Sequence, residues 1–149
     1  MDSGLVRDVR LHVILTAMDT AVVPTAAETA SSLRISNELV VDAYRRLSDG
    51  HVYVLEPSDP TRLRMANPFS AVPTAFQVEA SGKSYYANCV WDGLGVISLM
   101  GGSGQLKSDC PDCGEALTLV VSDRRLVNGN GIVHFSVPAA HWWDDIIHT

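Results

Sequence analysis

The sequence predicts an α+β protein: an N-terminal three-helix, winged-helix-like domain, then a small, mainly antiparallel β domain with short helices. Three observations predict this class. Apolar residues recur at helical spacing through the first third of the chain, short strand-like runs separated by turn residues follow, and a two-proline connector lies between the two patterns. We place the first domain at residues 1–66, the linker at 67–75 and the second domain at 76–149.

Composition and charge limit the classes of protein. Of the 149 residues, 46% are apolar and 19% are charged, which favours a packed core over disorder. The net charge of −6 argues against a nucleic-acid or anionic-membrane partner. No apolar run reaches the ~18 residues that cross a bilayer, and the N-terminus lacks a basic signal-peptide region. We therefore expect a cytoplasmic protein whose three cysteines are free or metal-bound.

Three helices are expected at the N-terminus. Leu5–Ala17 carries apolar residues at four-residue intervals, and Pro24 suits the first turn of a second helix that ends near Ser32. Ser36 is a good N-cap for a third helix, which Asp49-Gly50 ends. The expected inner face of this third helix consists of Leu39, Val40, Ala43, Tyr44 and Leu47.

Two short strands after these helices complete a winged-helix pattern. They are expected at His51–Leu55 and Arg62–Met65, around the turn Pro57–Pro60. Residues 1–66 hold seven Lys or Arg against nine Asp or Glu, and the third helix is itself acidic. Because phosphate neutralisation supplies most non-specific affinity for DNA, we expect this domain to cap its neighbour and not to read DNA.

The linker and the second domain are expected to form further strands. Asn67–Thr74 should be extended and should pack through Phe69 and Val72. A hairpin is expected at residues 76–79 and 83–86, turning at Ser81-Gly82. The remaining expected elements are a strand at Leu117–Ser122, a turn at Asn128–Gly131, a partner strand at Ile132–Val137 and a last helix at Ala139–Ile147 with Trp142, Trp143 and Ile146 facing inward.

Cys89 and Asp92 are the first candidate site. An apolar run with helical spacing begins beside them, so one helical turn would separate the two side chains on one face. If Asn88 caps this helix, Cys89 lies in the first turn, where the helix dipole favours a thiolate. A thiolate beside a carboxylic acid is a nucleophile or soft-metal ligand with a proton donor next to it. The alternative is a buried structural cysteine beside a solvated carboxylate.

Cys110-Pro111-Asp112-Cys113-Gly114 is the second candidate site. Its proline and glycine shape a tight turn that brings two sulfurs together, as in metal knuckles. A structural zinc ion needs four ligands, which Cys89, His134, His141 or His148 could complete. A knuckle that serves only as a turn is an equal alternative, and His134 alone is more typical of a structural histidine.

These stretches together resemble the alkylmercury (organomercurial) lyases and their relatives. The resemblance covers nearly the whole chain and is carried by four motifs: Asn67–Thr74, Tyr85–Asp92, Cys110–Gly114 and Val133–Pro138. It implies protonolysis of the carbon–mercury bond, with Cys89 as the attacking thiolate and Asp92 as the proton donor. Mercury is soft and prefers thiolate sulfur. The expected products are a hydrocarbon and Hg²⁺, which the cysteines hold.

The resemblance also implies the partners. It implies no cofactor, an organomercurial substrate, and a thiol reductant or mercuric reductase that accepts Hg²⁺, as in mercury resistance. The family's second catalytic cysteine would fall at Thr149 or just past it, so we expect the sequence to stop before that nucleophile. Cys113, or after it Cys110, could replace this sulfur.

Two other functions are alternatives to the lyase. One is a non-catalytic protein that binds Zn, Cu or Hg through Cys89, Cys110 and Cys113, and the other is a metal-sensing winged-helix regulator.

Overall fold

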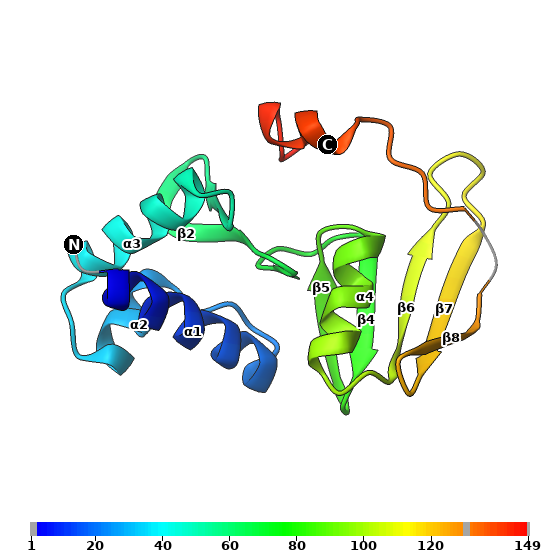
Figure 1. Cartoon of the computed structure of the whole chain (residues 1–149), viewed down its shortest axis with the longest axis horizontal. Helices are drawn as coiled ribbons and strands as arrows, with labels where there is room; N and C mark the ends of the chain where they lie inside the picture. Colours follow the sequence, from blue (N-terminus) through cyan, green and yellow to red (C-terminus); the bar gives the residue numbers. More distant parts are fainter. Residues whose placement is uncertain (1–2, 130–131, 149) are drawn as a thin grey trace.

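One antiparallel sheet runs through the whole molecule. The structure, a computed structural model, describes residues 3–129 and 132–148. Its eight strands lie in the order β1-β2-β3-β5-β4-β6-β7-β8, with the N-terminal helices at one end and α4 against β4, β5 and β6 (Figure 1). The predicted α+β class with an antiparallel sheet is confirmed. The strands are β1 (Tyr53–Glu56), β2 (Asp59–Ala66), β3 (Phe69–Ser70), β4 (Phe76–Ala80), β5 (Lys83–Ala87), β6 (Gly104–Asp109), β7 (Ala116–Ser122) and β8 (Arg125–Asn128).

The three N-terminal helices form where the sequence predicts them. They are α1 (Ser3–Thr20), α2 (Ala26–Leu33) and α3 (Asn37–Asp49). Ser36 caps α3 as predicted, accepting a bond from the amide of Leu39. The predicted start of α2 is wrong, because Thr25 is the N-cap and forms a capping box with Glu28, which leaves Pro24 outside the helix. The predicted inner position of Leu39 is also wrong, since Val41 is buried in its place.

The linker is part of the sheet. Phe69 is buried and pairs with Ala66 of β2 on one side and Ala87 of β5 on the other. Its burial confirms the prediction that the linker packs against the rest of the protein through Phe69. The short strand β3 thereby joins the β1–β2 hairpin to the strands that carry the candidate site.

The β4–β5 hairpin is confirmed, but the last predicted hairpin is wrong. Ser81 and Gly82 both have positive φ in the β4–β5 turn, as a two-residue type I′ turn requires. β7 pairs instead with β8, through a turn at Asp123-Arg124 whose two residues also have positive φ. The tight turn therefore forms before Asn128, and Ile132–Val137 forms no strand. Asn130 and Gly131, in the predicted turn, lie outside the described residues.

The C-terminal segment returns across the molecule from β8 towards the N-terminal helices (Figure 1). Its helix is a short 3₁₀ helix, η1 (Ala139–Asp144), and not the predicted α-helix to Ile147. Trp142 and Trp143 are only half-buried. The ring of Trp143 stacks on His51 before β1, with centroids 4.3 Å apart and planes 6° apart. This contact ties the end of the segment to the N-terminal part of the chain.

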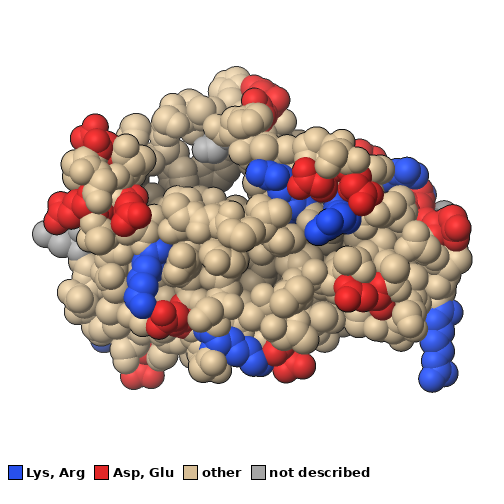
Figure 2. Space-filling view, turned by 180° about the vertical axis from the view of Figure 1, so that it is seen from behind, with Lys and Arg blue, Asp and Glu red and all other residues tan. Residues whose placement is uncertain are grey.

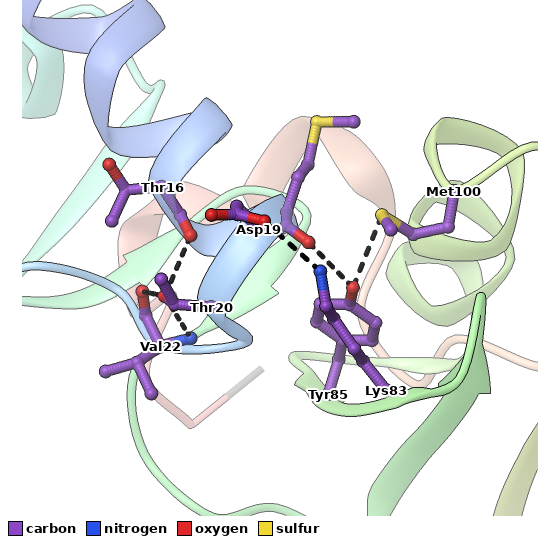
Figure 3. Close-up of polar contacts among 8 residues, drawn as sticks. Thr16, Asp19, Thr20, Val22, Lys83, Tyr85 and Met100 are labelled. Atoms are coloured by element: carbon purple, nitrogen blue, oxygen red, sulfur yellow. Dashed lines mark hydrogen bonds and ion pairs between the residues drawn. The ribbon is translucent and has the colours of Figure 1, made fainter.

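The end of α1 is held against the second half of the sheet. The hydroxyl of Tyr85 on β5 donates to the backbone oxygen of Met18 at 2.9 Å and to Met100 Sδ at 3.5 Å, and Lys83 pairs with Asp19 at 3.4 Å (Figure 3). Ala17 contributes to the same core cluster as Phe69. Helix α1 thus packs on both halves of the molecule.

No helix in the described ranges is long and apolar enough to cross a membrane.

Candidate functional site

Cys89 is the N-cap of helix α4 (Val90–Leu99). Its Sγ accepts a bond from the backbone amide of Asp92 at 3.4 Å, and its carbonyl accepts from the amide of Gly93 at 2.9 Å. The predicted capping role of Asn88 is therefore wrong by one residue. Sulfur takes the place that a serine or asparagine oxygen usually occupies at this position. Cys89 and Asp92 are close together, as predicted.

Asn88 instead contacts the carboxylate of Asp92. Its Nδ2 donates to Asp92 Oδ2 at 2.9 Å and to Asn67 Oδ1 at 3.1 Å. Asn88 Oδ1 is buried and has no hydrogen-bond partner among the described residues. This positioning role of Asn88 was not predicted from the sequence, although the four-residue spacing between Asn88 and Asp92 could have indicated it.

Burial governs the protonation of both groups. It raises the pKa of the Cys89 thiol, the negative charge of Asp92 adds to the rise, and the amide of Asp92 lowers it only in part. The expected first-turn thiolate is therefore not favoured. Burial also raises the pKa of Asp92, and the hydrogen bonds from Asn88 and Cys89 oppose that rise. The pair consequently favours a neutral thiol beside a carboxyl group that holds its proton to higher pH than an exposed one.

The pair faces a large cavity between the sheet and the C-terminal segment. The cavity has a volume of about 1320 Å³, and Cys89 and Asp92 line it together with residues of α4, β7 and the C-terminal segment. Figure 2 shows an opening beneath the arch at the top of the molecule, where the C-terminal segment runs. A small organic molecule can therefore reach the thiol and the carboxyl group from the same space.

A smaller aromatic hollow adjoins this cavity. Trp91, Phe135 and Trp142 line it, and the rings of Phe135 and Trp142 lie 4.9 Å apart. Trp91 is 65% exposed although Ala87, four residues before it at the end of β5, is fully buried. No role for Trp91 or Phe135 was predicted from the sequence. The tryptophan two residues after the candidate nucleophile was the sequence signal that could have indicated an aromatic wall beside the site.

Cys110 and Cys113 form the predicted knuckle at the end of β6. The amide of Gly114, at a φ of 72°, donates to the carbonyl of Cys110 at 2.8 Å, and the amide of Cys110 donates to Glu115 at the same distance. The amides of Cys113 and Asp112 and the side chain of Cys113 donate to the Cys110 sulfur, which lowers the pKa of that thiol.

The knuckle does not join a larger set of metal ligands in the part of the chain that the structure describes. There, no three His, Cys, Asp or Glu residues are grouped to hold an ion. His141 and His148 bond to Asp144 and Asp145, and His134 is exposed. A structural zinc ion and a three-cysteine site with Cys89 therefore stay predictions.

Comparison with known proteins points to one family. The family model described as alkylmercury lyase matches residues 69–149, more than half of the chain. A solved structure, the mercury-bound form of MerB2, is similar with a TM-score of 0.66 and 18% identity, over 87% of this chain and 61% of that one. The chain thus spans about three fifths of that protein's length, and the likeness shows the fold. No curated protein matches the chain.

Proposed function

The chain belongs to the alkylmercury lyase family, and from that premise we propose that it cleaves the carbon–mercury bond of organomercurials by protonolysis. The observation that carries this proposal is the pairing of Cys89 and Asp92 at the start of α4, with Sγ 3.4 Å from the amide of Asp92, in one accessible cavity. The substrate is a small organomercurial, and the products are a hydrocarbon and Hg²⁺. No cofactor is needed.

The first step is a ligand exchange at mercury. The Cys89 thiol loses its proton, and its sulfur displaces the ligand that the substrate R–Hg–X carries, giving Cys89–S–Hg–R and HX. The softness of mercury drives this exchange towards sulfur. Because burial raises the pKa of Cys89, its thiolate fraction is smaller than that of an exposed thiol, and capture should slow as the pH falls.

The second step is proton transfer to carbon. Asp92 gives its proton to the carbon bound to mercury, the Hg–C bond breaks, and RH leaves, with Hg²⁺ on Cys89 and a carboxylate at Asp92. Burial supports this role because it keeps Asp92 protonated to higher pH. General-acid catalysis of this kind contributes about 10²–10⁴-fold in typical enzymes.

A second sulfur would polarise the Hg–C bond further. Cys113, and after it Cys110, are the candidates within the chain, and a thiol reductant is an external one. A thiol reductant or a mercuric reductase then takes the ion.

The alternative function, a soft-metal binder without lyase activity, is favoured by one observation, the paired sulfurs of the knuckle.

Hydrocarbon release tests the proposal. The reduced protein is incubated with phenylmercuric acetate, and benzene is measured by gas chromatography. We expect benzene from the parent protein, none above background from Cys89→Ser, and a much smaller amount from Asp92→Asn. Mercury capture without benzene in the parent protein would reject the lyase function and leave the soft-metal binder.

A further inference from the structure

The knuckle lies beside the cavity that holds the proposed catalytic pair. Asp109 and Pro111, the two neighbours of Cys110, line that cavity together with Cys89 and Asp92. The side chain of Cys113 is exposed, and that of Cys110 is partly exposed. The two knuckle sulfurs therefore belong to a turn that borders the same cavity as Cys89.

The backbone holds these two sulfurs together. The turn from Cys110 to Glu115 is closed by two backbone hydrogen bonds of 2.8 Å, and the side chain of Cys113 contacts the Cys110 sulfur. Amides of Asp112 and Cys113 also point at that sulfur. Little conformational freedom is then lost when one ion binds both sulfurs, so the pair acts as a chelate.

The number of ligands selects the ion. Zinc takes four protein ligands in structural sites, and within the described ranges no third Cys, His, Asp or Glu joins the pair. Hg²⁺ is satisfied by two thiolates in a linear arrangement and is among the softest of ions. A pair of sulfurs with no further ligand therefore fits Hg²⁺ better than it fits zinc.

We infer that Cys110 and Cys113 form a separate two-sulfur site that accepts Hg²⁺ released at Cys89. The inference rests on the proposed function for the source of the ion. In the transfer, both knuckle thiols lose their protons, two S–Hg bonds form and the Cys89–Hg bond breaks. One proton goes to the Cys89 sulfur and the other to solvent. The site of the chemistry is thereby freed of its product before any external thiol arrives.

Mercury retention by variants that lack Cys89 tests the site itself. Reduced full-length Cys89→Ser is mixed with one equivalent of HgCl₂ and with glutathione as a competing monothiol, and bound mercury is counted by native mass spectrometry. We expect one ion per chain, bound with loss of two protons. Adding Cys113→Ser or Cys110→Ser should reduce retention about tenfold or more, because the second sulfur no longer acts at millimolar effective concentration.

Asp112→Asn in the Cys89→Ser background is the matched control, since it keeps both sulfurs and should retain the ion. Retention that survives Cys113→Ser, or no retention by Cys89→Ser at all, would overturn the inference. Circular dichroism of each variant checks that the fold is intact. Retention of Zn²⁺ in preference to Hg²⁺ would also overturn it.

A single turnover separates this inference from the proposed function. The parent protein is given less than one equivalent of phenylmercuric acetate, and peptide mapping then locates the bound mercury. Benzene with mercury on the peptide holding Cys110 and Cys113 supports both. Benzene with mercury only on the Cys89 peptide rejects the knuckle as acceptor and keeps the lyase. If the parent protein releases no benzene, but the knuckle retains HgCl₂ in the retention experiment, the two-sulfur site stands and the lyase function is rejected.

Discussion

Asn88 Nδ2 lies 2.9 Å from Asp92 Oδ2, one helical turn away, and donates a hydrogen bond to the carboxylate. This bond lowers the pKa of Asp92, whereas burial raises it, and burial is the larger cause. Asn88 thus orients the proposed proton donor and also limits how strongly its proton is held.

Removing this hydrogen bond should shift the pH dependence of hydrocarbon release. In Asn88→Ala the carboxylate loses a donor, so the pKa of Asp92 rises further and the carboxyl form persists to higher pH. The decline of benzene release at alkaline pH should therefore begin at a higher pH than in the parent protein. Release is measured across the pH range, with Asn128→Ala, another cavity-lining asparagine, as control. An unchanged or lower pH of decline would contradict the role of Asn88.

Asp92→Asn should separate mercury capture from bond cleavage. The amide has no proton to give, so benzene release should fall by about 10²–10⁴-fold. The thiol of Cys89 remains, and protein-bound phenylmercury should still be detected by mass spectrometry. Asp109→Asn, a change of the same kind in the same cavity, is the control and should keep its activity. Equal losses in both variants would mean that the proton comes from elsewhere.

Alkylation rates should distinguish the cysteines. Burial raises the pKa of Cys89, whereas amide hydrogen bonds lower the pKa of Cys110. Because the thiolate is the reactive form, Cys110 should react with iodoacetamide several-fold faster than Cys89 at neutral pH. The difference should narrow as the pH rises past both pKa values. Peptide mapping after timed quenching measures each rate, and equal rates at neutral pH would contradict this ordering.

The sequence predicts the elements whose signals are local. Helix α3 begins after Ser36 and ends before Gly50 as expected, because capping depends on nearby residues alone. Ser81-Gly82 likewise makes the β4–β5 turn through its own backbone preference. The β7–β8 turn could not be predicted in this way. Asp123 and Arg124 adopt positive φ without glycine, at a cost that the pairing of β7 with β8 offsets.

The candidate site shows the same division. The spacing of Cys89 and Asp92 predicts their proximity, because one helical turn separates them on any helix. Their protonation could not be predicted, since it depends on burial, and the cavity beside the pair is lined by residues from distant parts of the chain, such as Met65, Leu117 and Trp142. The Trp143–His51 stack joins residues that are far apart in the sequence, so no local pattern indicates it.

Two glycines of α4 should respond oppositely to alanine. A Cβ at Gly93 would lie 2.8 Å from Leu106 Cδ1, and Leu106 is buried, so Gly93→Ala should destabilise the fold by about 1–3 kcal/mol. A Cβ at Gly95 would meet Pro68 at 3.4 Å, an ordinary contact, and Gly95→Ala should add about 0.5–1 kcal/mol of helix stability. Urea unfolding measures both, and destabilisation by Gly95→Ala as large as that by Gly93→Ala would contradict this packing.

The stack of Trp143 on His51, with centroids 4.3 Å apart, should hold the C-terminal segment over the cavity. Aromatic pairs contribute about 0.5–1.5 kcal/mol, so Trp143→Ala should open the segment up to about tenfold more often. Chymotrypsin cleavage after the exposed Phe135 should then be faster by a similar factor.

His51→Asn tests the same contact from the other side, because asparagine tolerates the positive φ of 59° at this position. The double variant should be cleaved no faster than Trp143→Ala alone, since both changes remove one interaction. Tyr86→Ala, an exposed aromatic on β5, controls for general loss of stability and should leave cleavage unchanged. Additive effects in the double variant would mean that each ring holds the segment through other contacts, and the stack would then not be its anchor.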